Sequence, residues 1–232
     1  MHNLKTILKK IWKTIQNIIF PIECISCKKA DTLICYHCLS TVHTRFNNSK
    51  LESGLEVYAA YGFAIPLIRK LITRAKYYCT PIIFEELTLH AISTLAPIFS
   101  LHKKQNIILI PVPLHFMRLQ KRGFNQSQII AETLSNTFLN TEVLQLVKRI
   151  KNTPQQAKLN KANRIKNIEK SFQIETKLFT ETLLQNLSEY KFMIVDDVIS
   201  TGSTVLEVEK LLIKEFKIPK KNIMAISLCR GG

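Results

Sequence analysis

The sequence is poor in glycine, and the positions of its few glycines exclude several common nucleotide-binding motifs. Only six of the 232 residues are glycine, at positions 54, 62, 123, 202, 231 and 232. No G-x-G-x-x-G and no G-x-x-x-x-G-K-[ST] pattern can be assembled from them, and G-x-S-x-G is also missing. Dinucleotide-binding, P-loop ATPase and nucleophile-elbow hydrolase functions are therefore excluded.

Acidic residues and long apolar runs are also scarce. The chain has 17 Asp and Glu against 33 Lys and Arg, a net charge of +16. This excess predicts an anionic partner such as a nucleotide, a polyphosphate, nucleic acid or a membrane surface, although a general coding bias toward lysine would have the same effect. No apolar stretch approaches the ~20 residues that span a bilayer, and lysines interrupt each early apolar run, unlike a signal peptide. We therefore expect a cytoplasmic chain.

The most informative segment is a strand, a loop and a helix near the carboxyl end. The apolar run Phe192–Val195 ends in two adjacent carboxylates, Asp196 and Asp197. A turn rich in hydroxyl groups follows, with the residues Ser200, Thr201, Gly202, Ser203 and Thr204. Beyond it, apolar residues recur at spacings of three and four, as on one face of a helix, at Val205, Val208, Leu212 and Phe216.

This order of residues predicts a site for a phosphorylated ribose. Free N–H groups at the start of a helix bind phosphate, and the serine and threonine hydroxyls add further donors. Asp196 and Asp197 do not bind phosphate directly, but they suit ribose hydroxyls or a magnesium ion held through water. The alternative is an ordinary strand-to-helix turn in which one aspartate caps the helix.

Residues 192–204 resemble the phosphoribosyl pyrophosphate (PRPP) binding motif of type I phosphoribosyltransferases. The resemblance implies an α/β fold in which helices cover both faces of a parallel sheet. It also implies that PRPP binds at Asp196, Asp197 and residues 200–204, together with Mg²⁺. Purine-salvage members of this superfamily have an aspartate where this chain has Ser200. A purine acceptor is therefore disfavoured.

Four cysteines form a second pattern close to the amino end. Two C-x-x-C pairs lie in one short segment, with their cysteines at Cys24, Cys27, Cys35 and Cys38. The spacing predicts a zinc ion bound by four thiolates. Such a site is closed and leaves no open position for catalysis, so the zinc is expected to be structural. Disulfides and a redox dithiol are the alternatives, and His37 or His43 could replace a thiolate. Cys79 and Cys229 are expected to be small buried residues.

These patterns divide the chain into three parts. Residues 1–20 read as an amphipathic helix with basic flanks, which packs on its own domain or lies on a membrane. Residues 21–48 form a double zinc-ribbon-like knuckle, and 49–232 form the phosphoribosyltransferase-like domain. Within it, strands are expected at 55–61, 107–110, 142–147 and 224–228, and helices at 65–78, from Pro81 to about Ala96, and around Ile130, Leu134 and Phe138.

A basic segment from Lys148 to Asn167 lacks apolar periodicity and is expected to be a flexible loop. In a PRPP enzyme such a loop suits a flap that closes over pyrophosphate and excludes water. A solvated loop or a basic face for nucleic acid is the alternative.

Two further stretches resemble the ComF family, also called competence protein F or GntX-like. The first includes Pro111-Val112-Pro113, Arg118 and Arg122-Gly123-Phe124-Asn125-Gln126, and the second includes Arg149, Thr153, Gln156, Leu159, Arg164, Asn167 and Phe172. Members of this bacterial, cytoplasmic family also commonly have a four-cysteine knuckle at the amino end. Some of its members are linked to uptake of transforming DNA.

The two resemblances together imply a function and a competing one. PRPP would transfer its phosphoribosyl group to an unknown acceptor and release pyrophosphate. Asp196 and Asp197 would favour the charge developing on the sugar. The pyrophosphate would lie near the turn of Pro111, Val112, Pro113 and His115, and Arg149 or Arg164 would close over it. The alternative is a non-catalytic competence factor that binds single-stranded DNA or partner proteins and uses the PRPP pocket as a sensor.

Overall fold

The computed structural model describes residues 22–152, 171–175 and 186–231. The predicted helix over 1–20 and most of the predicted loop 148–167, including Arg164, lie outside these residues. The chain divides into two compact units, Met1–His43 and Thr44–Gly232, and each is described by itself.

The first unit is a small knuckle held by local hydrogen bonds. A bridge between Glu23 and Ala30 closes its first turn, and the short helix α2 (Tyr36–Ser40) follows. Cys35 caps α2, since its Sγ accepts a hydrogen bond from the N–H of Cys38 at 3.4 Å. The two cysteine pairs therefore lie in the first turn and at the start of α2.

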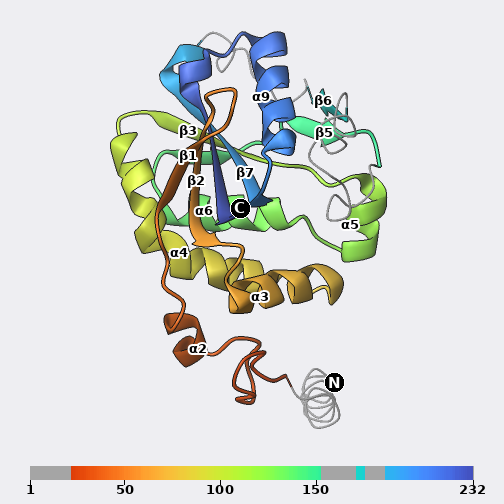
Figure 1. Ribbon diagram of the computed structural model, residues 1–232. Coiled ribbons are helices and arrows are strands. Elements are labelled where there is room, and N and C mark those ends of the chain that lie inside the picture. Colours follow the sequence, from red (N-terminus) through yellow and green to blue (C-terminus); the bar gives the residue numbers. More distant parts are fainter. Residues whose placement is uncertain (1–21, 153–170, 176–185, 232) are drawn as a thin grey trace, which may run out of the picture. The chain divides into compact units, whose positions relative to one another are not determined.

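The second unit is built on a six-stranded sheet in the order β1-β2-β8-β7-β3-β4 (Figure 1). Its strands are β1 (Asn47–Lys50), β2 (Glu56–Gly62), β3 (Asn106–Pro111), β4 (Thr141–Val143), β7 (Tyr190–Ile199) and β8 (Ile223–Arg230). Only β1 is antiparallel to its neighbour, and the other pairs are parallel. The predicted α/β fold with a mostly parallel sheet is confirmed.

Helices cover both faces of this sheet, as predicted. They are α3 (Pro66–Tyr77), α4 (Ile82–Leu101), α5 (Phe116–Arg122), α6 (Gln126–Thr137) and α9 (Ser203–Phe216). Helix α9 packs on alternate residues of β3 and β7, among them Ile108, Ile110, Phe192 and Ile194. The residues between these point to the opposite face, where α6 contacts β3 and β7 and α4 contacts β2 and β8. In Figure 1, α9 lies apart from the group of α3, α4 and α6.

Helix α4 is the one described helix that is long and apolar enough, by length and composition, to cross a membrane. It also runs further than the expected end near Ala96, since Pro97 lies inside it. Its apolar residues are used within the domain: Phe84, Leu87 and Leu95 are fully buried where α4 contacts the sheet and α6. Packing in the core therefore accounts for its composition.

The single strand predicted at 142–147 is wrong, because the chain there forms two strands in two sheets. Strand β4 continues the large sheet, and the N–H of Leu144 still bonds to Leu109 of β3. The carbonyl of Leu146 instead accepts from Glu175, and β5 (Val147–Arg149) pairs with β6 (Phe172–Ile174). Lys148 and Arg149 therefore lie on a strand, not at the start of a loop.

The two remaining cysteines differ from each other. Cys229 on β8 is fully buried, as predicted. Cys79 is exposed, contrary to the prediction, because it follows the end of α3 in a left-handed turn with φ 51°.

The connections place a crevice between β3 and β7. From β3 the chain passes through α5 and α6 to β4, at one edge of the sheet. From the neighbouring β7 it passes through α9 to β8, on the other side. Two adjacent parallel strands whose connections leave in opposite directions open a crevice at their carboxyl ends, which is where open α/β sheets bind ligands.

Candidate functional site

The acid pair lies in this crevice, inside β7 and not after it. The strand continues beyond the carboxylates to Ile199, which pairs with Arg230 of β8. Asp196 and Asp197 retain only 9% and 4% of their exposure. Both acids are therefore buried within a strand, and their removal affects the fold as well as the site.

Three side chains from distant helices hold the two carboxylates. Lys76, at the end of α3, forms an ion pair with Asp197. The first turn of α6 supplies Gln126, whose Nε2 donates to Asp197 Oδ1 at 3.2 Å, and Ser127, whose Oγ donates to Asp196 Oδ1 at 3.1 Å. The acid pair is thus fixed by α3 and α6 together.

Asp196 keeps a proton to a higher pH than an exposed aspartate does. Burial, followed by the charge of Asp197, raises the pKa of Asp196 to about 7, while Lys76 acts in the opposite direction. Asp196 also accepts a hydrogen bond from the N–H of Asp197 at 2.9 Å. A proton is therefore available on Asp196 near neutral pH, next to the ion-paired Asp197.

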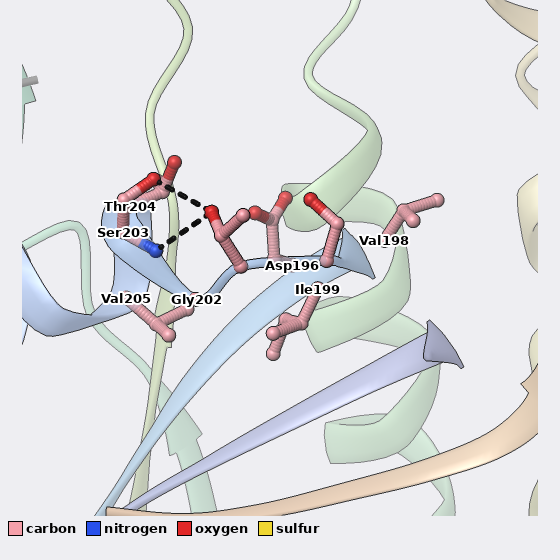
Figure 2. A pocket seen from close by; sticks show the side chains of 9 residues that line it. Asp196, Val198, Ile199, Gly202, Ser203, Thr204 and Val205 are labelled. Carbon is pink, nitrogen blue, oxygen red and sulfur yellow. Dashed lines mark hydrogen bonds between the residues drawn. The ribbon is translucent and has the colours of Figure 1, made fainter. Parts of the chain in front are cut away.

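The hydroxyl-rich turn is a tight loop between β7 and α9. Gly202, with φ +79°, precedes the helix, and an added Cβ would lie 2.3 Å from Leu51 Cδ1. Glycine is therefore required there for its conformation and for the close approach of Leu51. The hydroxyls of Thr201 and Ser203 are 3.1 Å apart. Figure 2 shows Asp196, Gly202, Ser203 and Thr204 around a cavity of about 20 Å³.

Arg230, the last residue of β8, holds this loop by its carbonyl groups. Its Nη1 donates to the carbonyl of Ile199 at 2.7 Å and to that of Ser200. Its Nε donates to Ser49 Oγ at 3.2 Å. Since N–H and C=O point in opposite directions across a trans peptide, the N–H groups of Ser200 and Thr201 are directed away from Arg230. Sequence reasoning missed this role, which no local motif signals.

A larger cavity of about 390 Å³ adjoins the acid pair. Val112, Pro113 and Leu114, from the turn after β3, line it together with Arg149. The other predicted residues of this turn lie elsewhere. Pro111 is paired within β3 opposite Val195. His115 caps α5 through its Nδ1, which accepts from the N–H of Met117 at 3.3 Å.

The cavity is strongly cationic on the side of β3 and α5. Burial lowers the pKa values of Arg118 and Arg122, and it lowers that of Arg149 to about 10. For Arg149, repulsion by Arg118 adds to burial, and the charge of Asp196 opposes both. Arg122 also donates to Gln126 Oε1 at 2.6 Å, so it is linked through Gln126 to the acid pair. Such a cluster is suited to an anion with several charges.

Sequence reasoning missed Lys76, Ser127 and Arg230 as parts of this site and quoted Gln126 only as part of a resemblance. Asn125 gives a local signal, because it caps α6 and its Nδ2 donates to the carbonyl of Val112 at 3.1 Å. That bond ties the start of α6 to the turn after β3. Lys76 has no local signal, because it reaches Asp197 only when the end of α3 and strand β7 are brought together in the folded chain.

The cysteine cluster in the first unit has the geometry of a four-thiolate site. The Sγ atoms of Cys24, Cys27, Cys35 and Cys38 all lie within 4.8 Å of one another, and none is in a disulfide. Zinc–sulfur bonds of about 2.3 Å in a tetrahedron require sulfur atoms just under 4 Å apart. The cluster is therefore compatible with structural zinc, and within the described residues no histidine belongs to it.

The thiol of Cys24 favours metal binding, whereas Cys38 has a pKa raised to about 12, because the opposing hydrogen bond with Ser26 is outweighed by hydrogen bonds with the neighbouring thiols and by burial. Burial alone would raise the pKa of Cys24, but hydrogen bonds from the backbones of Cys27, Cys35 and Ser26 outweigh it and lower the pKa to about 6. Metal ligation needs the thiolate form, so these donors favour a bound cation.

Curated relatives support the family that the motifs indicate. Competence protein F of Haemophilus influenzae is 36% identical over 107 residues, which cover 46% of this chain and 44% of that relative. The DNA utilization protein YhgH is 33% identical over 106 residues in Salmonella typhimurium and 32% identical in Escherichia coli K12, covering 46% of this chain and 43% of each relative.

The chain is therefore similar to proteins of the ComF family over this part of its length. The match spans less than half the length of the curated relatives, and no protein-family model matches the chain. The names of these relatives refer to competence and to DNA utilization.

Proposed function

We propose that this chain binds PRPP and transfers its phosphoribosyl group to an acceptor, with release of pyrophosphate. One observation carries the proposal: the acid pair, the hydroxyl-rich loop and a cationic cavity converge at the switch point between β3 and β7. Each part matches one part of PRPP, namely the ribose diol, the 5-phosphate and the pyrophosphate.

The 5-phosphate would lie on the loop at residues 200–204. The N–H groups at the start of α9 and those directed away from Arg230 supply donors, and Thr201 and Thr204 supply hydroxyls. Because the loop is already held in place, phosphate binding costs less conformational entropy than binding to a flexible loop would.

The ribose would lie over Asp196 and Asp197. Their carboxylate oxygens accept hydrogen bonds from the 2- and 3-hydroxyls. In the ionised state, which for Asp196 predominates above about pH 7, they stabilise the positive charge that develops on carbon 1 in the transition state. The acceptor's lone pair forms a bond to carbon 1 as the bond to the pyrophosphate oxygen breaks. The electron pair of that bond leaves with pyrophosphate.

The pyrophosphate would lie against Val112–Leu114, within reach of Arg118, Arg122 and Arg149. Each planar guanidinium group can donate two hydrogen bonds to phosphate oxygens, and burial strengthens these contacts. Lys76, Gln126 and Ser127 already contact the carboxylates, which keep lone pairs for the ribose hydroxyls but form no open metal site, so magnesium would be held through water and substrate oxygens. When bound, it would neutralise charge on the pyrophosphate.

A thermal-shift experiment tests this proposal. PRPP with magnesium at ~100 times its dissociation constant adds about 2.7 kcal/mol to stability, and the melting temperature rises accordingly. Single-stranded DNA of random sequence, at equal phosphate concentration, should give no comparable shift. A shift with DNA and none with PRPP would contradict the proposal.

The second candidate is a competence factor that binds single-stranded DNA. A cavity of about 310 Å³ beside the first is lined by Tyr77 and Met117 among four cations, Lys76, Arg118, Lys121 and Arg122. Aromatic groups beside cations suit stacked bases and their phosphates. Tyr77 follows Lys76 directly in sequence, and the fold brings its ring beside the cations of α5. Anisotropy with labelled DNA, with and without Tyr77→Ala, would test this candidate.

A further inference from the structure

One end of the 390 Å³ cavity is built by α3 and by Phe63 in the connection between β2 and α3. Phe63 follows β2, and Arg69, Ile72 and Thr73 come from the first turns of α3. The guanidinium of Arg69 lies 6.0 Å from the centre of the Phe63 ring. Ile72 is 1% exposed and forms an apolar floor. We call these four residues the α3 end of the cavity.

The sheet order places the α3 end opposite the pyrophosphate contacts. Phe63 follows β2, and the turn Val112–Leu114 follows β3, while β8 and β7 lie between these strands. Asp196 and Asp197 on β7 therefore lie between the two walls of the cavity. Displacement at carbon 1 needs the incoming and leaving groups on opposite sides of the ribose. With pyrophosphate on the β3 side, the acceptor approaches from the α3 end.

The chemistry of the α3 end restricts the acceptor. The Phe63 ring and the Ile72 side chain offer flat apolar surface for a planar ring. Arg69 forms no ion pair with any carboxylate among the described residues, so its guanidinium can pair with an acidic group of the ligand. No carboxylate or imidazole belongs to the α3 end, and the carboxylates that line the same cavity, Asp196 and Asp197, are already held by Lys76, Gln126 and Ser127. The attacking atom should therefore carry a lone pair and no proton.

We infer that the α3 end is the acceptor subsite and that it takes a planar heteroaromatic carboxylate with an unprotonated ring nitrogen. This rests on the proposed phosphoribosyl transfer. The ring nitrogen forms the bond to carbon 1 with its lone pair, the bond from carbon 1 to oxygen breaks, and pyrophosphate leaves with that electron pair. No proton has to be removed.

The test compares an acid with its neutral isostere. The protein is first saturated with ribose 5-phosphate and pyrophosphate, so that the arginines of α5 and the loop of α9 are occupied. Pyridine-3-carboxylate and pyridine-3-carboxamide are then titrated by calorimetry. The acid should bind about tenfold more tightly, since one charge-assisted hydrogen bond distinguishes the two.

Two variants locate the effect. Arg69→Gln should remove the preference for the acid, and Arg69→Lys should keep part of it. Lys70→Gln removes the neighbouring cation of α3, which does not line the cavity, and should keep the preference. Affinity for ribose 5-phosphate should stay unchanged in all three, which also shows that they fold.

The outcomes separate this inference from the proposed function. Equal affinities of wild type for acid and amide, or an undiminished preference in Arg69→Gln, would overturn the acceptor subsite while ribose 5-phosphate still bound. If wild type failed to bind ribose 5-phosphate, the proposed function itself would be contradicted, and the inference with it.

Discussion

The cysteine knuckle and the acid-pair site are assembled in opposite ways. The four thiols come from one short segment, Cys24–Cys38, and local backbone hydrogen bonds place them. The partners of the acid pair come from α3 and α6, and the neighbouring loop is held from β8. The knuckle has little core of its own and depends on its ligands, whereas the site depends on the whole sheet. Removing single groups should therefore affect the two regions very differently.

Metal removal should have the largest effect, and that effect should be confined to the knuckle. Metal analysis of protein prepared without chelators should find about one zinc per chain. After chelation, hydrogen exchange should show loss of protection in residues 24–42 and none in β7, because the sheet has its own core. Metal-free protein with a protected knuckle, or a disulfide among these cysteines, would refute the zinc assignment.

Neutralising the acid pair should have the largest effect on the sheet site. Asp196→Asn with Asp197→Asn removes two charge-assisted acceptors, each worth about 1.5–3 kcal/mol. Affinity for PRPP should fall by at least a factor on the order of a hundred, measured by titration calorimetry.

The same double variant should also lose stability, since both residues are buried and Lys76 loses its partner. Circular dichroism gives the temperature below which the variant stays folded, and the titration is made there. Glu142→Gln, an exposed acid on β4, is the matched control and should change neither quantity. Undiminished PRPP affinity in the folded double variant would show that the acid pair does not bind the sugar.

Loss of the hydrogen bonds from Arg230 to the loop carbonyls should have a smaller and more selective effect. Arg230→Lys keeps the charge but loses the paired contacts to Ile199 and Ser200, which position the loop. Affinity for ribose 5-phosphate should fall by about tenfold while affinity for pyrophosphate stays the same. Ser49→Ala removes only the Nε partner and should cost less. An equal loss for both ligands would indicate general damage instead of a positioning role.

The smallest expected effect is a pH dependence of stability. The pKa of Asp196 in the folded chain, about 7, is above its value in an unfolded chain. Between these two values the native state binds a proton that the unfolded chain has lost. The resulting contribution of Asp196 to stability is fully present below about pH 4 and is lost as the pH rises through about 7. The melting temperature of wild type should fall over this range relative to that of Asp196→Asn. Parallel curves for the two proteins would contradict the raised pKa.

The sequence predicted what depends on neighbouring residues. Periodicity and the acid-hydroxyl pattern identified β7, α9 and the parallel sheet, and the C-x-x-C spacing identified the cluster, because these signals lie within a single element. It failed at 142–147, where a buried Leu146 turns the chain into a second sheet. An apolar residue that fits a strand and one that fits a turn against the core look alike in sequence.

Long-range partners were not predictable for the same reason. Lys76 and Arg230 become part of the site only because α3 crosses beside β7 and β8 pairs with it. The burial of Asp196 and Asp197 was missed because adjacent acids usually mark an exposed strand end. Here Lys76, Gln126 and Ser127 satisfy them inside the fold.

The most direct test of the account is where a sugar phosphate binds. Amide chemical shifts of the isotope-labelled chain, recorded during titration with ribose 5-phosphate, report this residue by residue. We predict that the largest changes fall at Ser200–Thr204 and at Asp196–Val198, and that Arg230→Lys weakens them. Changes spread over surface lysines, or confined to α5 with none in the loop before α9, would contradict the proposal that this loop binds the 5-phosphate.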